Sequence, residues 1–308
     1  MKRISSSVII CTRNRIAGIV TCLQSLIQQT EQADEIIVVD SSDQPLQELL
    51  KFTGIFSQKF FPTTTLIYKH TTPGLAYQRN VAITLASKKI VHFLGDDLIL
   101  SPDYIAQMNA TFADHPKYAG GMGMVANMPL PVRRNLGWLF LKVFLLQRGG
   151  ASGNFTASGM PTYLCGYDGF KTVQVLGCCM SYRLAIFAKH RFDEKLQRYG
   201  LLQDSDFSRR VAYDAPLFYN GAAKFEHHPS VSGCDGIVDN RAMYIKNYSY
   251  LFFKNFYPRN RLKIVAYAWS VIGLFLQAVG GRRGNEIRGY CRGLKEFYGN
   301  KKVKKMGA

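Results

Sequence analysis

The chain has 308 residues, a formal net charge of +18 and 47% hydrophobic residues. This apolar content is enough for a folded core and excludes disorder over most of the length. The seven cysteines are odd in number, form no Cys-x-x-Cys pair and include the adjacent Cys178-Cys179, which has poor geometry for a structural disulfide. This pattern indicates reduced thiols in a cytosolic compartment.

In the first hundred residues, short apolar runs alternate with segments that have the periodicity of an amphipathic helix. Short, mainly apolar runs predict buried strands at residues 8–11, 35–40, 65–68 and 90–94. Helices are expected over 17–29, 45–51 and 73–86 and from residue 101 onward. The apolar run that includes residues 8–11 is too short for the core of a signal peptide and is more typical of a first strand. This alternation predicts a parallel sheet with right-handed crossovers.

Polar residues follow three of these predicted strands. Thr12-Arg13-Asn14 comes after the first strand, Asp40 ends the second, and Asp96-Asp97 follows the fourth. In parallel sheets ligands bind beyond the carboxyl ends of the strands, so these residues are expected to share one site.

The middle of the chain is less regular. An apolar stretch at 136–146 precedes a loop rich in Gly and Ser. A strand is predicted at 173–180, a helix at 204–213, and two short strands at 216–220 and 223–227.

Most of the positive charge is near the C-terminal end. Residues 241–308 carry 15 Lys and Arg against 2 Asp and Glu, so this segment is expected to have an anionic partner, either lipid or nucleic acid. Residues 264–281 have no charge and are flanked by Arg and Lys on both sides. As a helix this run is about 27 Å long, and it could span a membrane, lie in its interface or pack on the domain. The flanking charges do not favour a span, and Trp269 suits an interface.

Several polar residues are candidates for chemistry, each with a plainer alternative. Asp96-Asp97 could bind a hard divalent cation or form a solvated turn. Asp40 could bind a base or ribose, or cap a turn. Arg79 lies one turn into a helix opened by Pro73-Gly74 and could bind a diphosphate, or it could be an ordinary surface residue.

The second half adds two more candidates. One carboxylate of Asp204 and Asp206 could be a general base while the other caps the helix or meets Arg209 or Arg210. His227 could be a metal ligand or a turn residue before Pro229. The adjacent Cys178-Cys179 pair is expected to pack in the core.

Taken in order, these segments resemble the family-2 glycosyltransferases of the GT-A fold, over roughly residues 5–230. The resemblance is carried by residues 7–15, 25–30, 35–40, 73–80, 91–97 with 102–104, 177 with 182–183, 192–194, 203–207 and 224–227. It implies a Rossmann-like α/β fold with a mostly parallel central sheet flanked by helices. It also implies a hexosyltransferase-like enzyme that uses a nucleotide-sugar donor and a glycan or lipid-linked glycan acceptor, in a single displacement with inversion.

The resemblance also implies roles for individual residues. Asp204 would be the catalytic base; Asp97 and His227 would hold Mg²⁺ or Mn²⁺; and the donor would contact Thr12, Arg13, Asp40, Arg79 and Asp96. Two positions depart from the family pattern, because Gly95 and Gln203 stand where acidic residues are usual. A neutral Gln203 removes a like charge beside Asp204.

The same resemblance suggests an organisation for the whole chain. Residues 1–100 would be the nucleotide-sugar-binding half, residues 101–235 the acceptor and catalytic half, and residues 236–308 a basic helical tail that associates with anionic membrane. The expected location is the cytoplasmic face of a bacterial inner membrane, as a peripheral enzyme of surface-polysaccharide or lipopolysaccharide synthesis.

Three rival interpretations stay open. An inactive nucleotide-sugar-binding scaffold would explain Gly95 and Gln203, but the chain retains Asp97, Arg79 and Asp204. A nucleic-acid-binding protein would explain the charge, but the excess is confined to the tail and no recognised nucleic-acid module is present, so no nucleic-acid partner is expected. A nucleotidyltransferase would need a basic, Gly-rich loop after the first strand, which is missing.

Overall fold

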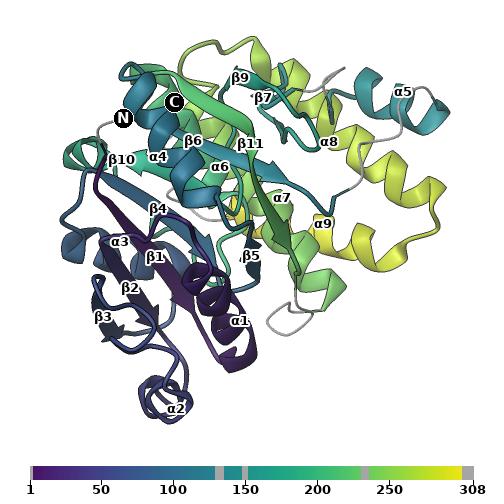
Figure 1. Ribbon diagram of the computed structural model, residues 1–308. Coiled ribbons are helices and arrows are strands. Elements are labelled where there is room, and N and C mark those ends of the chain that lie inside the picture. The colour runs from purple at the N-terminus through teal and green to yellow at the C-terminus, as the bar shows by residue number, and fades with distance from the viewer. Residues whose placement is uncertain (1–2, 129–134, 148–151, 230–235, 300–308) are drawn as a thin grey trace.

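The computed structural model describes residues 3–128, 135–147, 152–229 and 236–299. Its centre is a nine-stranded sheet of order β3-β2-β1-β4-β10-β6-β11-β5, with β9 paired to β11, and β7 and β8 form a small separate sheet (Figure 1). The strands are β1 (Ser6–Thr12), β2 (Glu35–Asp40), β3 (Thr65–His70), β4 (Ile90–Gly95), β5 (Leu98–Leu100), β6 (Gly120–Val125), β7 (Asn154–Phe155), β8 (Pro161–Thr162), β9 (Phe170–Val173), β10 (Met180–Arg183) and β11 (Leu217–His227).

Helices surround this sheet and form the C-terminal part. They are α1 (Ile16–Ile27), α2 (Gln47–Thr53), α3 (Leu75–Leu85), α4 (Tyr104–Asp114), α5 (Leu136–Val143), the 3₁₀ helix η1 (Leu184–Ala188), α6 (Gln203–Asp214), α7 (Ile237–Asn255), α8 (Lys263–Gly280) and α9 (Gly284–Gly299). The predicted α/β architecture, with a mostly parallel central sheet flanked by helices, is confirmed.

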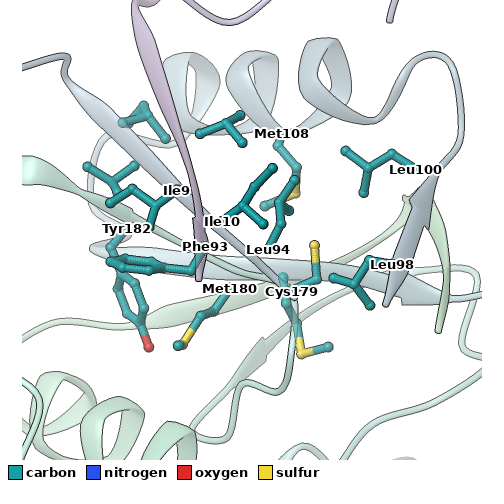
Figure 2. Packing of buried hydrophobic residues seen from close by; sticks show 14 of the residues in the cluster. Ile9, Ile10, Phe93, Leu94, Leu98, Leu100, Met108, Cys179, Met180 and Tyr182 are labelled. Carbon is teal, nitrogen blue, oxygen red and sulfur yellow. The ribbon is translucent and has the colours of Figure 1, made fainter. Parts of the chain in front are cut away.

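The core lies between the sheet and its flanking helices. Figure 2 shows Ile9 and Ile10 of β1 beside Phe93 and Leu94 of β4, with Tyr182 of β10 next to them. These side chains are at most 4% exposed. Each stabilises the fold by roughly 1.5–3 kcal/mol through burial, which explains why uninterrupted apolar runs form the central strands.

Two sequence predictions in the second half are corrected by the structure. The strand predicted at 173–180 is wrong, because Val173 ends β9 and Met180 begins β10. Between them the chain leaves the sheet, and the N–H groups of Gln174 and Val175 both donate to the carbonyl of Gly153. The two strands predicted at 216–220 and 223–227 form a single strand, β11, whose register shifts between Asn220 and Lys224.

The C-terminal helices pack on each other and on the sheet domain. Helix α9 approaches α7 closely at Gly293, where a Cβ atom would lie 2.3 Å from the carbonyl oxygen of Ala242. Helix α7 docks on α6 through Lys254, whose ammonium is 2.9 Å from the fully buried Asp206 carboxylate. Asp206 also pairs with Arg210 at 2.8 Å, as predicted for the second acid of this helix.

Helix α8 is, in the part of the chain that the structure describes, the one helix long and apolar enough to cross a membrane, although 28% of it is buried. Its buried face includes Tyr267, Leu274 and Ala278. The opposite face is also apolar but exposed.

Candidate functional site at the carboxyl edge of the sheet

The polar residues after the first strands lie together at one edge of the sheet. In the parallel ladders Thr12 pairs with Asp40, and Cys11 pairs with Gly95. Because β1, β2 and β4 run in the same direction, Thr12, Asp40 and Asp96 reach the same edge, as the sequence predicts.

Asp96 is held at this edge by residues of the first turn. Its carboxylate is 5% exposed and accepts hydrogen bonds from the Thr12 hydroxyl at 2.7 Å and from the Arg15 guanidinium at 2.9 Å. Burial raises the pKa of Asp96 and outweighs the lowering by Thr12 and Arg15. Helix α1 can pack this close because residue 18 is glycine; a Cβ there would lie 2.6 Å from the Asp96 carbonyl oxygen.

Asp97 faces His227 at the end of β11. The His227 Nε2 atom is 3.5 Å from Asp97 Oδ2, and Asn127 fixes the backbone of His227 through hydrogen bonds of 2.9 and 3.0 Å. Burial raises the pKa of Asp97, but His227 and Arg15 more than reverse this and hold it below the usual value. At Gly95 a Cβ would lie 2.6 Å from Asp97 Oδ1, so the glycine leaves room for this carboxylate.

The donor atoms of Asp97 and His227 fit a divalent cation that a ligand helps to hold. Among the described residues no group of three or more His, Cys, Asp and Glu side chains converges on one point. Asp97 and His227 supply one carboxylate and one imidazole, close enough to share an ion. Magnesium sites in enzymes commonly use one or two carboxylates and complete the shell with substrate phosphates and water.

Asp40 organises the loop that follows β2. It is fully buried and accepts hydrogen bonds from Ser42 N–H, Leu46 N–H and the Tyr68 hydroxyl at 2.8, 2.8 and 2.5 Å. Next to it, the buried Ser41 hydroxyl oxygen has no hydrogen-bond partner among the residues that the structure describes. Asp40 therefore shapes the loop where a nucleoside was predicted to bind.

Arg13 lies apart from the Asp96 and Asp97 carboxylates in this conformation. Its guanidinium pairs with Asp43 at 3.1 Å, and both side chains are more than half exposed. The neighbouring Arg15 takes the position beside the two buried carboxylates instead. Its part in the site was missed from the sequence, where the only available signal was its place in the same run as Thr12.

The second part of the site is an ion pair between Arg79 of α3 and Asp204 of α6. Arg79 is 6% exposed and its guanidinium lies over the Phe192 ring at 5.1 Å from the centroid, so it is not an ordinary surface residue. Gln78 ties the same helix to the sheet edge by donating to the carbonyls of Thr12 and Val39 at 3.0 and 2.8 Å. Beside Asp204, the buried Oε1 atom of Gln203 has no hydrogen-bond partner in the described part of the chain.

Two partly buried cysteines, Cys11 and Cys178, are influenced by the charges of this site. Burial raises the pKa of the Cys178 thiol, and the negative charges of Asp204 and Asp97 raise it further. Burial also raises the pKa of Cys11 to about 12, with Arg79 and Asp96 both acting on it. The contacts connect the same groups. Gln78 donates to the carbonyl of Thr12, and the Thr12 hydroxyl donates to Asp96. Arg79, which follows Gln78 in α3, pairs with Asp204, so the sheet edge and this ion pair form one site.

The sequence matches glycosyl transferase family 2 over residues 7–168, about half of the chain. No curated protein sequence is significantly similar to it. Among solved structures, GalNAc-T7 with UDP, GalNAc and Mn²⁺ is similar with a TM-score of 0.60 and 15% identity, over 82% of this chain and 48% of that one. S. aureus TarS 1–349 with UDP is similar with a TM-score of 0.52 and 15% identity, over 96% of this chain and 92% of that one. The chain thus spans about half the length of GalNAc-T7, and these likenesses concern the fold.

Proposed function

The chain belongs to glycosyl transferase family 2, and from this premise we propose that it moves a sugar from a nucleoside diphosphate to a hydroxyl of a glycan or lipid-linked glycan, with inversion. The observation that carries the proposal is a set of contacts that joins the two parts of the site. Gln78 of α3 donates to the carbonyl of Thr12, whose hydroxyl donates to Asp96, and the next residue of the same helix, Arg79, pairs with Asp204. The proposed metal ligand Asp97, which follows Asp96, and the proposed base Asp204 therefore belong to one connected set of residues at the sheet edge.

The donor would lie along the ends of β1, β2 and β4. We propose that its nucleoside contacts Thr12 and the loop shaped by Asp40, and that Arg13 closes over it from the rim of the site. Asp96, fixed by Arg15, would face the ribose and diphosphate. Both similar solved structures contain UDP, which makes UDP-sugars the first donors to test.

Asp97 and His227 would hold Mg²⁺ or Mn²⁺, and the bound ion would supply positive charge next to the departing diphosphate. GalNAc-T7 was solved with Mn²⁺. The two protein ligands leave most of the coordination shell to donor oxygens and water, so metal affinity is expected to be weak without donor and strong with it.

Asp204 would take the proton of the acceptor hydroxyl while that oxygen bonds to the anomeric carbon and the diphosphate leaves from the opposite face. A single displacement of this kind inverts the anomeric centre and needs no covalent intermediate. Arg79 would position the Asp204 carboxylate through their ion pair and add positive charge beside the diphosphate.

Replacement of the base tests this assignment. Asp204→Asn should lower turnover by about 10²- to 10⁴-fold, the usual contribution of a general base, and leave the donor Kd within a few-fold of the parent. Asp239→Asn removes a carboxylate that pairs with Arg292 on the surface and is the matched control. Near-normal turnover of Asp204→Asn would remove Asp204 from the mechanism.

We further propose that the enzyme is a peripheral protein on anionic membrane and that α8 lies in the interface. Five exposed apolar residues follow one another along one face of α8 at intervals of three and four, each 43% to 70% exposed: Val265, Trp269, Ile272, Leu276 and Val279. Such spacing forms a continuous stripe about 21 Å long. The buried opposite face and the basic residues at both ends fit a helix in the plane of the membrane.

A further inference from the structure

Two adjoining cavities lie away from the carboxylate edge, between α5, α8 and the small β7–β8 sheet. The first has a volume of about 590 Å³ and is lined mainly by apolar side chains of α5 and α8, including Leu136, Trp138, Phe140 and Leu276. Figure 1 shows α5 at the periphery of the molecule, beside α8. This cavity has the size and the lining to take an apolar chain.

The second cavity, of about 530 Å³, is lined by three cations, Lys142, Arg209 and Lys263, together with aromatic rings and polar groups. Gln147 lines both cavities, which therefore adjoin. The combined site is apolar at one end and cationic at the other.

The cations of the second cavity have no carboxylate partner within the described ranges. Arg209 donates to Gln174 Oε1 at 2.9 Å and stacks on the Tyr213 ring at 4.1 Å from the centroid. Its buried Nε atom has no hydrogen-bond partner among the described residues. Lys263 lies over the Phe256 ring at 5.5 Å. Like charges that are held together without a counter-charge favour the binding of an anion.

The electrostatics of these residues agree with that geometry. Burial lowers the pKa of Arg209 by more than Tyr213 raises it, and the neighbouring Arg259 lowers it further. Burial likewise lowers the pKa of Lys263, with Arg209 acting in the same direction. An anion between them would remove this mutual repulsion, and guanidinium with ammonium groups is the usual donor set for phosphate.

We infer that the two cavities form a binding site for a lipid phosphate, with the phosphate on Arg209, Lys263 and Lys142 and the apolar chain in the cavity between α5 and α8. The site opens beside the exposed stripe of α8, where a membrane lipid would enter. As the acceptor site of a glycosyltransferase, this inference rests on the proposed function. Arg209 follows Asp204 by five residues, so α6 carries both the anion site and the proposed base, on different sides of the helix.

Binding of dodecyl phosphate tests the inference without any turnover. The chain has two tryptophans; Trp138 lines the first cavity and Trp269 stacks on Phe144 beside it, so tryptophan fluorescence reports occupancy directly. Dodecyl phosphate below its micellar concentration should change the fluorescence saturably. Inorganic phosphate and dodecanol, which each offer one half of the ligand, should bind at least tenfold more weakly.

Charge variants identify the anion site. Arg209→Gln and Lys263→Gln should each weaken the binding of dodecyl phosphate on the order of tenfold, the usual effect of losing one charge-assisted contact. The affinity for dodecanol should not change. Arg261→Gln makes the same change of charge at an exposed position outside both cavities and should have no effect. Lys263→Gln keeps the test valid if loss of the stacked Arg209 disturbs folding.

Three outcomes would overturn the inference: equal affinity for dodecanol and dodecyl phosphate, equal affinity for inorganic phosphate and dodecyl phosphate, or the same loss in Arg261→Gln as in the cavity variants. The result is independent of the proposed transferase reaction. Failure of lipid phosphate binding in a protein that still hydrolyses a nucleotide sugar would refute only the lipid site. Normal lipid binding without any donor binding would instead refute the proposed function.

Discussion

His92 of β4 makes the stability of the fold depend on pH in a predictable direction. The ring is fully buried; its Nδ1 accepts a hydrogen bond from the Ser181 hydroxyl at 2.8 Å and its Nε2 donates to Asn109 Oδ1 at 3.1 Å. Burial lowers its pKa from 6.5 to about 4. Between these values the unfolded chain binds a proton that the folded chain does not, so the free energy of unfolding falls as the pH falls from 6.5 to 4. The difference amounts to roughly 3 kcal/mol.

Urea unfolding followed by circular dichroism at pH values from 7.5 to 4 measures this effect. The His92→Gln variant should be less stable than the parent at pH 7.5, but its stability should fall by roughly 3 kcal/mol less on the way to pH 4. His228→Gln is the control, because His228 is exposed and pairs with Glu226 at the surface. An equally steep fall in His92→Gln and the parent would refute the reasoning.

Two further predictions concern the C-terminal helices. Gly293→Ala should force α9 away from α7 and lower the free energy of unfolding in urea by about 1–3 kcal/mol. Gly280→Ala, at a position with open space around it, should not lower the free energy of unfolding. Equal effects of the two substitutions would contradict the close packing of α9 on α7. The full-length protein should bind anionic liposomes in flotation assays and be released by salt. The double variant Val265→Asp/Leu136→Asp changes side chains that are 70% and 86% exposed. It should lose liposome binding and keep its stability in urea. Liposome binding by this double variant at the parent level would exclude the exposed apolar surface as the contact.

The sheet edge could be predicted because its signals are local in sequence. Residues 36–39 form a β-branched apolar run between Glu35 and Asp40, and the strand has the predicted limits. The placement of Thr12, Asp40 and Asp96 at one edge then follows from the parallel order of the strands. No long-range information is needed for either step.

Contacts between distant segments could not be predicted in the same way. Arg79 and Asp204 are 125 positions apart, and their pairing depends on how α3 and α6 pack around Phe192. The contact of Arg15 with Asp96 spans 81 positions and depends on the close approach that Gly18 allows. The strand predicted at 173–180 failed because the carbonyl of Gly153, which lies outside that segment, takes the N–H groups that a strand would have offered to the sheet.

The central claim is that Asp97 belongs to the donor site of a metal-assisted glycosyltransferase. Its most direct test is release of nucleoside diphosphate from a panel of nucleotide sugars, beginning with UDP-sugars, with Mn²⁺, Mg²⁺ or EDTA and with or without a membrane lipid extract. We predict release from one donor that requires the metal, increases with the lipid extract and is lost in Asp97→Ala. Absence of both release and donor binding across the panel, or undiminished metal-dependent release by Asp97→Ala, would contradict the account.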